Sequence, residues 1–347
     1  QDDLRVLIMD EPTSSLSAAE VKVLFKIMRE LLEAGISIVY ISHRLEEIME
    51  IGDHVTVLRD GKYVADADVK DIELSWIVEN MVGKNTQYHR FQRTIDLTKQ
   101  PKILEVKNLR LPKKGGGWLL DNVSLDLKKG EVLGIYGLLG AGRSELFECL
   151  MGLHPEHTGE IIYEGKPLKV KDVATQIKNG FALVPEDRQS QGLIQTLDIG
   201  KNTSISSLKD YVKGLFLNEK AENDAVDEQI KDIHIKVADK RLPILSLSGG
   251  NQQKVVIGKG LLTKPKILLL DEPSRGIDIG AKTEVFEIIH DLAEKGLSII
   301  VISSELKEIM AIADRICVLS NGKKTGELIG DEITEDTLVR TSYAGLG

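Results

Sequence analysis

The chain opens on a run of apolar residues, Val6 to Met9, that ends at a pair of acidic residues. An unbroken apolar run of this length is typical of a strand that is buried on both faces. From Val21 to Leu32 the apolar residues recur at helical spacing instead, and Gly35 is placed to end that helix. A second apolar run, Ile36 to Ile41, follows. Strands that alternate with helices predict a parallel sheet covered on both faces.

The same pattern occurs a second time in the chain. Asp10 and Glu11 match Asp271 and Glu272 at an offset of 261 residues. The gapless match continues through Phe25 and Phe286, Gly35 and Gly296, Ser42 and Ser303, Glu47 and Glu308, and Gly61 and Gly322. One supersecondary unit is therefore used twice, at a spacing that corresponds to a domain and not to a short solenoid repeat.

The second copy has an upstream part that the first copy lacks. This part contains a β-rich stretch from Lys102, an apolar strand from Val132 to Tyr136 and a polar, mostly helical stretch from about residue 187. We expect an incomplete domain over residues 1–83, a linker over 84–101 and a complete domain over 102–347. The chain lacks an initiator Met and begins almost directly on a strand, so we expect it to be a piece of a longer protein.

A glycine-rich segment joins the strand that ends near Tyr136 to a predicted helix. It runs Gly-Leu-Leu-Gly-Ala-Gly-Arg-Ser from Gly137 to Ser144 and fits a phosphate-binding loop, with Arg143 where lysine is usual. Glycines let backbone N–H groups cradle phosphate oxygens, and the helix N-terminus adds partial positive charge. Arg143 can reach the outer phosphates and Ser144 can ligate Mg²⁺. Taken alone, an ordinary glycine-rich turn is an equally good interpretation.

Two later segments add chemistry of the same kind. Asp271 stands at the carboxyl end of an apolar strand, where it can hold Mg²⁺ through water, and Glu272 can take a proton from an attacking water. Leu-Ser-Gly-Gly-Asn, from Leu247 to Asn251, precedes that strand and offers backbone donors at the start of a helix. Each segment alone is weak evidence, since acidic turns and glycine-bearing helix starts are common.

In this order within one domain, the three segments resemble the nucleotide-binding domain of ABC ATPases. The resemblance implies an α/β fold of the P-loop NTPase type, with an antiparallel β subdomain, a helical subdomain and a second, incomplete copy at the N-terminus. It implies ATP and Mg²⁺ as cofactors. It also implies that each ATP lies between the phosphate loop of one domain and the Leu-Ser-Gly-Gly signature of another.

The resemblance assigns site residues by position. Those implied to contact the nucleotide are Gly137, Leu138, Gly140, Ala141, Gly142, Arg143, Ser144, Glu145, Glu186, Leu247, Ser248, Gly249, Gly250, Asn251, Asp278 and Ser304. Those implied to hold the metal are Ser144, Glu186, Asp271 and Asp10. Those implied to be catalytic are Glu11, Glu272 and the switch histidine His43. In the second copy Ser304 takes the position of that histidine, and Glu186 that of a glutamine.

Three details look like the second half of the tandem ATPases of ribose-, galactose- and xylose-type importers. They are Gly-Ala-Gly-Arg-Ser-Glu, Pro-Glu-Asp-Arg from Pro185, and Leu-Ser-Gly-Gly-Asn-Gln-Gln-Lys. Purine-nucleoside and autoinducer importers have similar ATPases. The likeness implies an ATPase that powers import of a small solute, foremost a monosaccharide. Its implied partners are membrane permease subunits and, through them, a periplasmic or extracellular solute-binding protein, with the chain at the cytoplasmic face of the inner membrane.

Composition bears on the alternatives. The formal net charge of −9 argues against a nucleic-acid binder, and two unrelated cysteines, Cys149 and Cys317, are typical of a cytosolic chain. No apolar run approaches the roughly 20 residues that cross a bilayer. A soluble tandem ABC ATPase acting on ribosomes or DNA would need a long charged linker or a zinc-binding insert. A nucleotide-binding regulator without turnover is suggested by Arg143 and Ser304, whereas Glu11 and His43 argue against it.

The departures from the family pattern also predict unequal sites. Arginine is bulkier than lysine, and serine has no titratable nitrogen to replace a histidine. We therefore expect the site on the Gly137 loop to bind ATP but to hydrolyse it poorly. We also expect the isolated chain to be nearly inactive, because the resemblance pairs each phosphate loop with the signature of another domain, and these partners are not in this chain. Two weaker signals are Trp118, which could stack on adenine or be simply a partly buried tryptophan, and the pair His154 and His157, which has the spacing of metal ligands but lies in a polar loop without further ligands.

Overall fold

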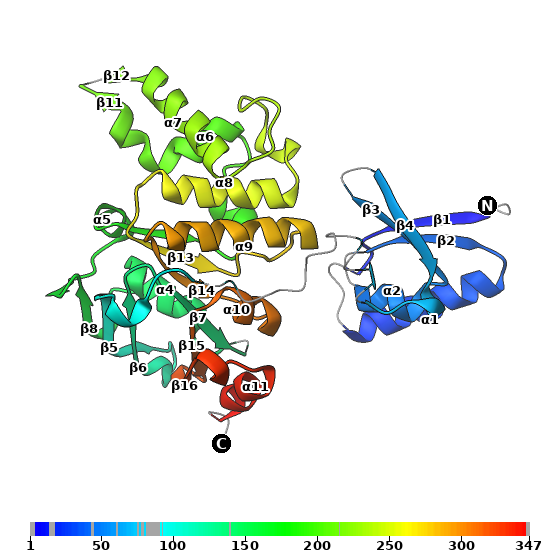
Figure 1. The fold of residues 1–347 in the computed structure, drawn as a ribbon, viewed down its shortest axis with the longest axis horizontal. Helices are drawn as coiled ribbons and strands as arrows, with labels where there is room; N and C mark the ends of the chain where they lie inside the picture. Colours follow the sequence, from blue (N-terminus) through cyan, green and yellow to red (C-terminus); the bar gives the residue numbers. More distant parts are fainter. Residues whose placement is uncertain are drawn as a thin grey trace. The chain divides into compact units, whose positions relative to one another are not determined.

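The computed structural model describes residues 4–13, 18–42, 45–59, 62–74, 76–77, 80, 91, 93–138, 140–214 and 216–344. The chain forms two compact units, Gln1–Gln87 with Asp278–Gly280, and Tyr88–Ile277 with Ala281–Gly347 (Figure 1).

The first unit has the strand–helix–strand order that the sequence predicts. Its elements are β1 (Val6–Asp10), α1 (Ala18–Glu33), β2 (Ser37–Ile41), α2 (Leu45–Ile51), β3 (His54–Arg59) and β4 (Lys62–Asp68). β1 pairs in parallel with β2, and β3 with β4 in an antiparallel hairpin. Phe25 and Met28 are the buried residues on the helical stripe of α1, and Gly35 follows the helix at a φ of 85°. Only glycine adopts that backbone without strain, so Gly35 ends the helix as expected.

The sheet of the first unit is not buried on both faces, contrary to the expectation from its apolar runs. Val6, Ile8, Val39 and Ile41 are between 48% and 67% exposed. Their repeat partners Ile267, Leu269, Ile300 and Ile302 are all fully buried in the second unit. The apolar pattern is the same in both copies, but the elements that cover this face in the second unit have no counterpart among the described residues of the first.

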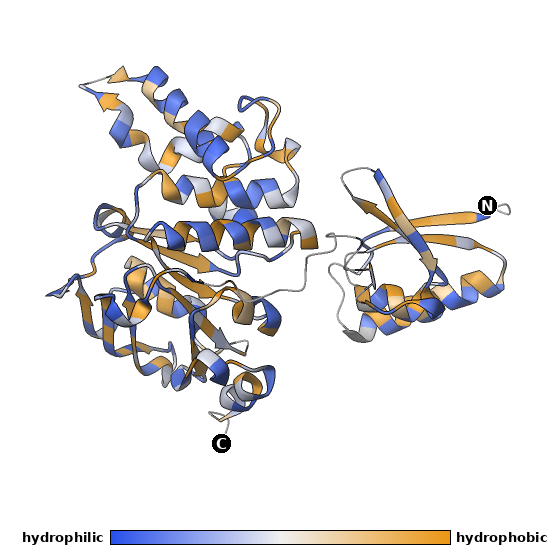
Figure 2. Ribbon diagram, in the orientation of Figure 1, coloured by the Kyte–Doolittle hydropathy of each residue, from blue (hydrophilic) through white to orange (hydrophobic). Residues whose placement is uncertain are grey.

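The second unit is built on a six-stranded sheet in the order β10-β13-β14-β7-β15-β16. The first five strands are parallel and β16 pairs antiparallel to β15. The bounds are β7 (Val132–Gly137), β10 (Phe181–Val184), β13 (Ile267–Asp271), β14 (Ser298–Ile302), β15 (Arg315–Ser320) and β16 (Lys323–Ile329). Figure 2 shows the central strands β13 and β14 as predominantly hydrophobic, as expected for a parallel sheet covered on both faces.

Successive residues of the central strands point into two separate cores. In β13, Leu268 and Leu270 join the core formed with α8 (Gly249–Leu261) and α9 (Ile279–Glu294). Ile267 and Leu269 join the core formed with α4 (Arg143–Met151) and the β subdomain. The sheet is therefore the middle layer of the unit, and the carboxyl ends of its strands meet along one edge. In parallel α/β sheets that edge is where ligands bind.

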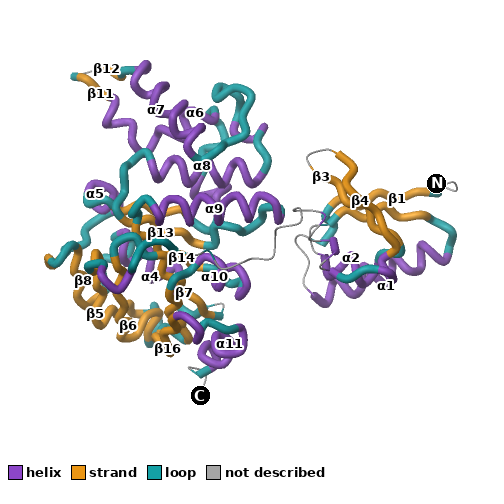
Figure 3. The backbone as a smooth tube through the Cα atoms, viewed as in Figure 1, coloured by secondary structure: helices purple, strands orange, loops and turns teal. Residues whose placement is uncertain are grey.

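Further helices and strands lie on either side of the six-stranded sheet and form the predicted subdomains (Figure 3). An antiparallel sheet in the order β6-β5-β8-β9 consists of β5 (Lys102–Pro112), β6 (Trp118–Lys128), β8 (Thr158–Tyr163) and β9 (Lys166–Pro167). The helical part contains α6 (Ile199–Ser204), α7 (Glu219–Asp232) and α8 (Gly249–Leu261), with a small hairpin of β11 (Val212–Lys213) and β12 (Phe216–Leu217). The remaining helices are α4 (Arg143–Met151), α5 (Val173–Lys178), α9 (Ile279–Glu294), α10 (Leu306–Ile312) and α11 (Glu335–Tyr343).

The described end of the predicted linker packs onto the second unit. Phe91 stacks on His290, with ring centroids 4.7 Å apart. The Arg93 guanidinium lies 3.1 Å from Glu294 and 3.3 Å from Asp314. These charged groups are nearly buried, so this stretch is held in place despite its lack of a sequence pattern. Within the described ranges, the structure contains no helix that is both long and apolar enough to span a bilayer.

Candidate nucleotide-binding site

The predicted phosphate loop lies where β7 ends and α4 begins. Gly137 passes so close to β15 that a Cβ there would lie 2.4 Å from the carbonyl oxygen of Leu319. Gly142 has a φ of 94°, and a Cβ there would lie 2.8 Å from the carbonyl oxygen of Leu119. The loop is thus pressed between β15 and β6, which only glycine permits. It places Arg143 and Ser144 in the first turn of α4, with their N–H groups toward the helix N-terminus.

Asp271 stands at the carboxyl end of β13, beside this helix start. It is only 6% exposed, and it receives a hydrogen bond from the Ser144 hydroxyl. Burial raises the pKa of Asp271 to about 6. Its Oδ1 is buried without a hydrogen-bond partner among the described residues. A hydroxyl beside a carboxylate with an unused buried oxygen is the donor set that Mg²⁺ prefers, so Ser144 and Asp271 fit the implied metal.

Glu272 is held on both of its carboxylate oxygens. Arg143 Nη1 lies 3.2 Å from Oε1, while the N–H and hydroxyl of Ser304 donate to Oε2 at 3.1 and 3.2 Å. The structure therefore brings together the loop arginine, the predicted base and the residue at the switch position. Because Ser304 contacts Glu272 directly, its short side chain is sufficient to reach the base, although it carries no titratable nitrogen.

The backbone at the predicted bases is left-handed in both copies. Glu272 has a φ of 45° and Glu11 a φ of 44°. The N–H of Glu272 donates to the Ile302 carbonyl at 3.0 Å, and that of Glu11 to the Ile41 carbonyl at 2.8 Å. A non-glycine residue in this region is strained and persists only where its surroundings enforce it. Strain repeated at the same position in both units marks these turns as functional candidates.

The signature segment forms the start of α8. Ser248 caps the helix, and its hydroxyl oxygen accepts from the Asn251 side-chain amide at 3.0 Å. The N–H of Lys236 donates to Asn251 Oδ1 at 2.8 Å. A Cβ on Gly250 would lie 2.3 Å from that of Ala281, so the helix packs closely against α9 there. Leu247 and Gly249 flank this cap, and the first turn of the helix directs its backbone N–H groups toward the N-terminus, where an anion could bind.

Arg188 holds the turn that follows Glu272 in place. The sequence identified this residue only as the last position of the Pro-Glu-Asp-Arg motif, without a role of its own. Its guanidinium donates to the carbonyl oxygens of Arg275 and Gly276 at 2.7 and 2.8 Å. Burial lowers the pKa of Arg188. Glu186, from the same segment, forms an ion pair with Arg275. The segment that follows β10 is therefore joined to the turn that follows Asp271 and Glu272, a link with no separate signal in the sequence.

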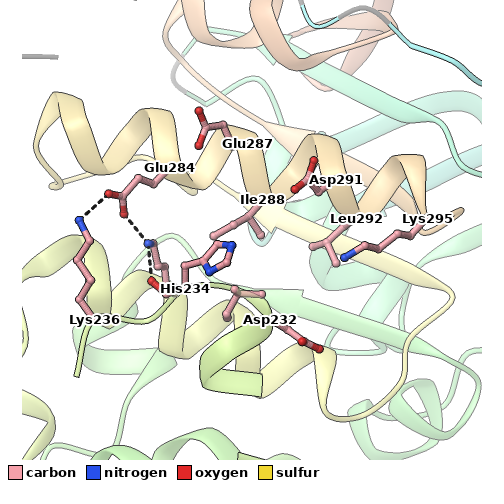
Figure 4. A pocket seen from close by; sticks show the side chains of 11 residues that line it. Asp232, His234, Lys236, Glu284, Glu287, Ile288, Asp291, Leu292 and Lys295 are labelled. Carbon is pink, nitrogen blue, oxygen red and sulfur yellow. Dashed lines mark hydrogen bonds and ion pairs between the residues drawn. The ribbon is translucent and has the colours of Figure 1, made fainter. Parts of the chain in front are cut away.

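A polar pocket lined by residues of α8, of α9 and of the segment around His234 shows how α8 is fixed to α9 (Figure 4). Lys254 is almost fully buried and donates to Glu284 and to the His234 carbonyl, while Lys236 donates to Glu284 at 2.8 Å. Burial favours the neutral form of Glu284, but these two lysines outweigh it and hold the pKa of Glu284 below its usual range. The contact of buried Lys254 with Glu284 therefore ties the signature helix to α9.

The predicted residues of the first copy are less enclosed. Asp10 and Glu11 are exposed at the end of β1. His43 lies outside the described residues. In the second copy, Asp278, which follows Arg275, is also exposed. The structure therefore places Asp10 and Glu11 on adjacent positions of one strand end, and the role of His43 stays a prediction.

Two weaker signals receive a structural account. Trp118 is 47% exposed at the start of β6, next to the Leu119 carbonyl that faces Gly142, and the Arg110 guanidinium lies 5.4 Å from its ring centre. About half of this side chain is therefore buried, and its ring is open to solvent beside the loop. Both ring nitrogens of His154 contact carboxylates, Nε2 with Glu148 at 2.7 Å and Nδ1 with Glu156 at 3.2 Å. Among the described residues no group of three or more His, Cys, Asp and Glu side chains could hold a metal ion, so His154 and His157 do not form such a site.

Comparison with known proteins gives the family. The family described as ABC transporter matches residues 120–275. A ribose import ATP-binding protein of Oceanobacillus iheyensis is 40% identical over 345 residues, covering 99% of this chain and 68% of that protein. The chain belongs to the ABC transporter family of ATP-binding proteins. A xylose import ATP-binding protein of Pseudomonas savastanoi pv. phaseolicola is 40% identical, and the match covers 98% of this chain and 66% of that protein. A galactose/methyl galactoside import ATP-binding protein of Clostridium perfringens is 44% identical, and the match covers 97% of this chain and 65% of that protein.

The ABC fold predicted from the motifs is confirmed by solved structures. A nucleotide-free ATP-binding cassette of an ABC transporter matches with a TM-score of 0.60 at 24% identity, covering 69% of this chain and 96% of the cassette. Another such cassette matches with a TM-score of 0.61 at 23% identity, covering 70% and 98%. The chain spans about two thirds of the length of its import-protein relatives, 65–68% in these three.

Proposed function

We propose that this ABC chain is an ATP-binding and ATP-hydrolysing subunit, or most of one, that powers import of a monosaccharide through a membrane permease. The observation that supports it best is the meeting of Ser144 and Asp271 at the end of the phosphate loop, with Oδ1 of Asp271 buried and unpartnered among the described residues. The three relatives named above are import proteins for ribose, xylose and galactose or methyl galactoside.

In this proposal the loop binds the phosphates through its backbone N–H groups and Arg143. Ser144 and Asp271 would hold Mg²⁺, with Glu186 as a further candidate ligand. Asp10 is the candidate metal ligand of the first copy, at the position equivalent to Asp271. When bound, Mg²⁺ neutralises phosphate charge. Trp118 offers an exposed ring beside the loop for the adenine. The signature, Leu247 to Asn251, would present its helix N-terminus to a nucleotide bound by another cassette, and Asp278 would lie at that contact.

The two predicted bases should act unequally. Arg143 and Ser304 contact the two carboxylate oxygens of Glu272, so an attacking water must compete with them for this carboxylate. We therefore assign most turnover to the site that uses Glu11 and His43. The site at Glu272 binds nucleotide and turns it over slowly. The contacts of Arg143 and Ser304 with Glu272 also favour one alternative, in which the second site binds nucleotide for regulation and does not hydrolyse it.

The proposed partners are permease subunits and, through them, a solute-binding protein outside the membrane. The chain would then act at the cytoplasmic face. Co-purification with two membrane proteins, and ATPase activity stimulated by a sugar-loaded binding protein, are the expected results. Recovery of ribosomes or DNA in place of membrane proteins would contradict the transport role.

ATP binding by the chain itself tests the site. Arg143→Ala and Ser144→Ala should each weaken Mg·ATP binding by about tenfold or more, because each removes a direct charged or metal contact. Arg241→Ala is the matched control, since Arg241 is exposed and pairs only with nearby Asp239 in the contacts described. Equilibrium binding of a fluorescent ATP analogue gives the measurement. Equal affinities for all four proteins would refute the assignment of the loop.

A further inference from the structure

Each unit contains a buried glutamate to which the proposed function gives no role. Glu308, in α10, is 1% exposed, and Glu47, in α2, is 8% exposed. A buried carboxylate is costly unless hydrogen bonds or an opposite charge compensate it. Glu47 and Glu308 occupy equivalent positions of the repeat, 261 residues apart. The contacts that compensate the two carboxylates can therefore be compared between the copies.

Glu308 connects two segments next to the proposed base Glu272: the turn that follows it and the segment that contacts its side chain. Ser274, two residues after Glu272, donates its hydroxyl to Glu308 Oε2. Ser303 donates to the same oxygen at 3.2 Å. Ser303 directly precedes Ser304, whose N–H and hydroxyl hold Glu272. One carboxylate oxygen thus fixes the turn after Glu272 and the segment that contacts its side chain.

Glu47 makes the same link in the first unit. The Thr13 hydroxyl, two residues after Glu11, donates to Glu47 Oε2 at 2.8 Å, and the Ser42 hydroxyl donates to it at 3.3 Å. Thr13 and Ser42 are the repeat partners of Ser274 and Ser303. The strand-end backbone that these hydroxyls flank carries the left-handed φ in both copies.

The other contacts of the two glutamates differ. Glu308 Oε1 accepts from Lys282 Nζ at 2.7 Å, whereas the equivalent position in the first copy is Val21. Glu47 accepts from the Tyr40 hydroxyl at 2.6 Å, whereas the equivalent of Tyr40 is Val301. Burial and the bond to Glu47 raise the pKa of Tyr40 to about 12, so this phenol keeps its proton. Both glutamates accept from the same pair of hydroxyls. This pair is present in both copies, although the third partner is Lys282 for Glu308 and Tyr40 for Glu47.

We propose that Glu308 and Glu47 are positioning residues for Glu272 and Glu11. Each holds the turn after the base and the segment before the switch position in one geometry, which keeps the strained base directed into the site. This rests on the proposed function only in that Glu272 and Glu11 line a nucleotide site. The link between the two segments is a property of the fold and can be tested without turnover.

Hydrogen exchange on the full chain tests the link. Glu308→Gln should speed exchange of the amides in 272–275 and 303–305 by about tenfold or more, because a neutral amide accepts the two hydroxyls more weakly than a carboxylate does and its NH2 group cannot accept from Lys282. Ser274→Ala, a smaller change that removes one donor, should affect the same segments to a lesser extent. Glu287→Gln, at an exposed position of α9, is the control. Unchanged exchange in these segments, or a uniform increase throughout the unit, would overturn the proposal.

A kinetic readout separates positioning from simple stabilisation. In the transporter assembled with its permease, Glu47→Gln should lower kcat by about tenfold or more and change KM for ATP by less than about twofold, since it acts on the base and not on phosphate binding. Equal losses in kcat and ATP affinity would overturn the positioning role. If the unmodified chain bound no ATP, the proposed function would fail while the exchange result would still stand.

Discussion

At the residue scale, the site depends on side chains that are held by neighbours and not by their own segment alone. Arg143 and Ser304 occupy the two oxygens of Glu272, and Ser144 contacts Asp271. The sequence identified these residues because their motifs have fixed spacings. It could not show that Arg143 would pair with Glu272, since that contact depends on how two strands lie in the sheet.

The unequal bases lead to a direct prediction. In the protein assembled for transport, Glu11→Gln should reduce ATP turnover by about 10²-fold or more, the usual contribution of a general base. Glu272→Gln should reduce it by less than about threefold, because this carboxylate is already engaged by Arg143 and Ser304. Steady-state phosphate release measures both. Similar losses in the two variants would exclude the asymmetry.

His154 gives a prediction about pH. Burial opposes its protonation, but Glu148 and Glu156 outweigh burial and raise the pKa of His154 above 6.5. Since the folded-state pKa is raised, the stabilisation is fully present below pH 6.5 and is lost as pH rises through the folded pKa. His154→Gln should therefore reduce stability at pH 6 by less than about 1 kcal/mol and have a smaller effect at pH 8.5. NMR titration of the ring protons gives the pKa, and a value below 6.5 would contradict the assigned contacts.

At the scale of elements, α8 shows how close packing positions the signature. The helix meets α9 at Gly250 and Ala281 and is tied to it by Lys254 and Glu284. The amphipathic pattern and the Ser248 cap predicted the helix. They could not predict the partner of Lys254, because a lysine in this pattern is normally assigned to the solvent-exposed face.

The close approach at Gly250 predicts a position-specific steric effect. Gly250→Ala should destabilise the chain by about 1–3 kcal/mol, because the new Cβ would overlap that of Ala281. Gly260→Ala in the same helix is the control, since its Cβ would lie at an ordinary 3.5 Å from that of Ala182. Helix propensity favours alanine equally at both positions. Urea unfolding should therefore show opposite signs for the two variants, and equal effects would refute the close contact.

At the scale of the whole molecule, the repeat places one pattern in two environments. Ile41 is 48% exposed and its partner Ile302 is fully buried, although both stand in strands of the same apolar pattern. The alternation of residues shows that a strand forms, whereas burial depends on which other elements cover it. That is why the fold of the second unit was predicted well and the exposed face of the first was not.

This difference can be measured with one substitution made twice. Ile302→Ala should destabilise the second unit by about 2–5 kcal/mol, because it removes packed side-chain volume from a closed core. Ile41→Ala should change stability by less than about 1 kcal/mol, because nearly half of that side chain is already exposed. Calorimetry of both variants beside the unmodified chain makes the comparison. A loss at Ile41 equal to that at Ile302 would show that its face is covered in solution.

The left-handed backbone at Glu11 and Glu272 has a consequence for protein engineering. Such a conformation costs a non-glycine residue about 1–3 kcal/mol, and glycine adopts it freely. At Glu11, whose side chain is exposed, glycine would relieve this strain and remove the proposed base in the same step. Selection of this chain for heat resistance alone would therefore favour variants with lost chemistry, and a thermostable active form would require simultaneous selection for turnover.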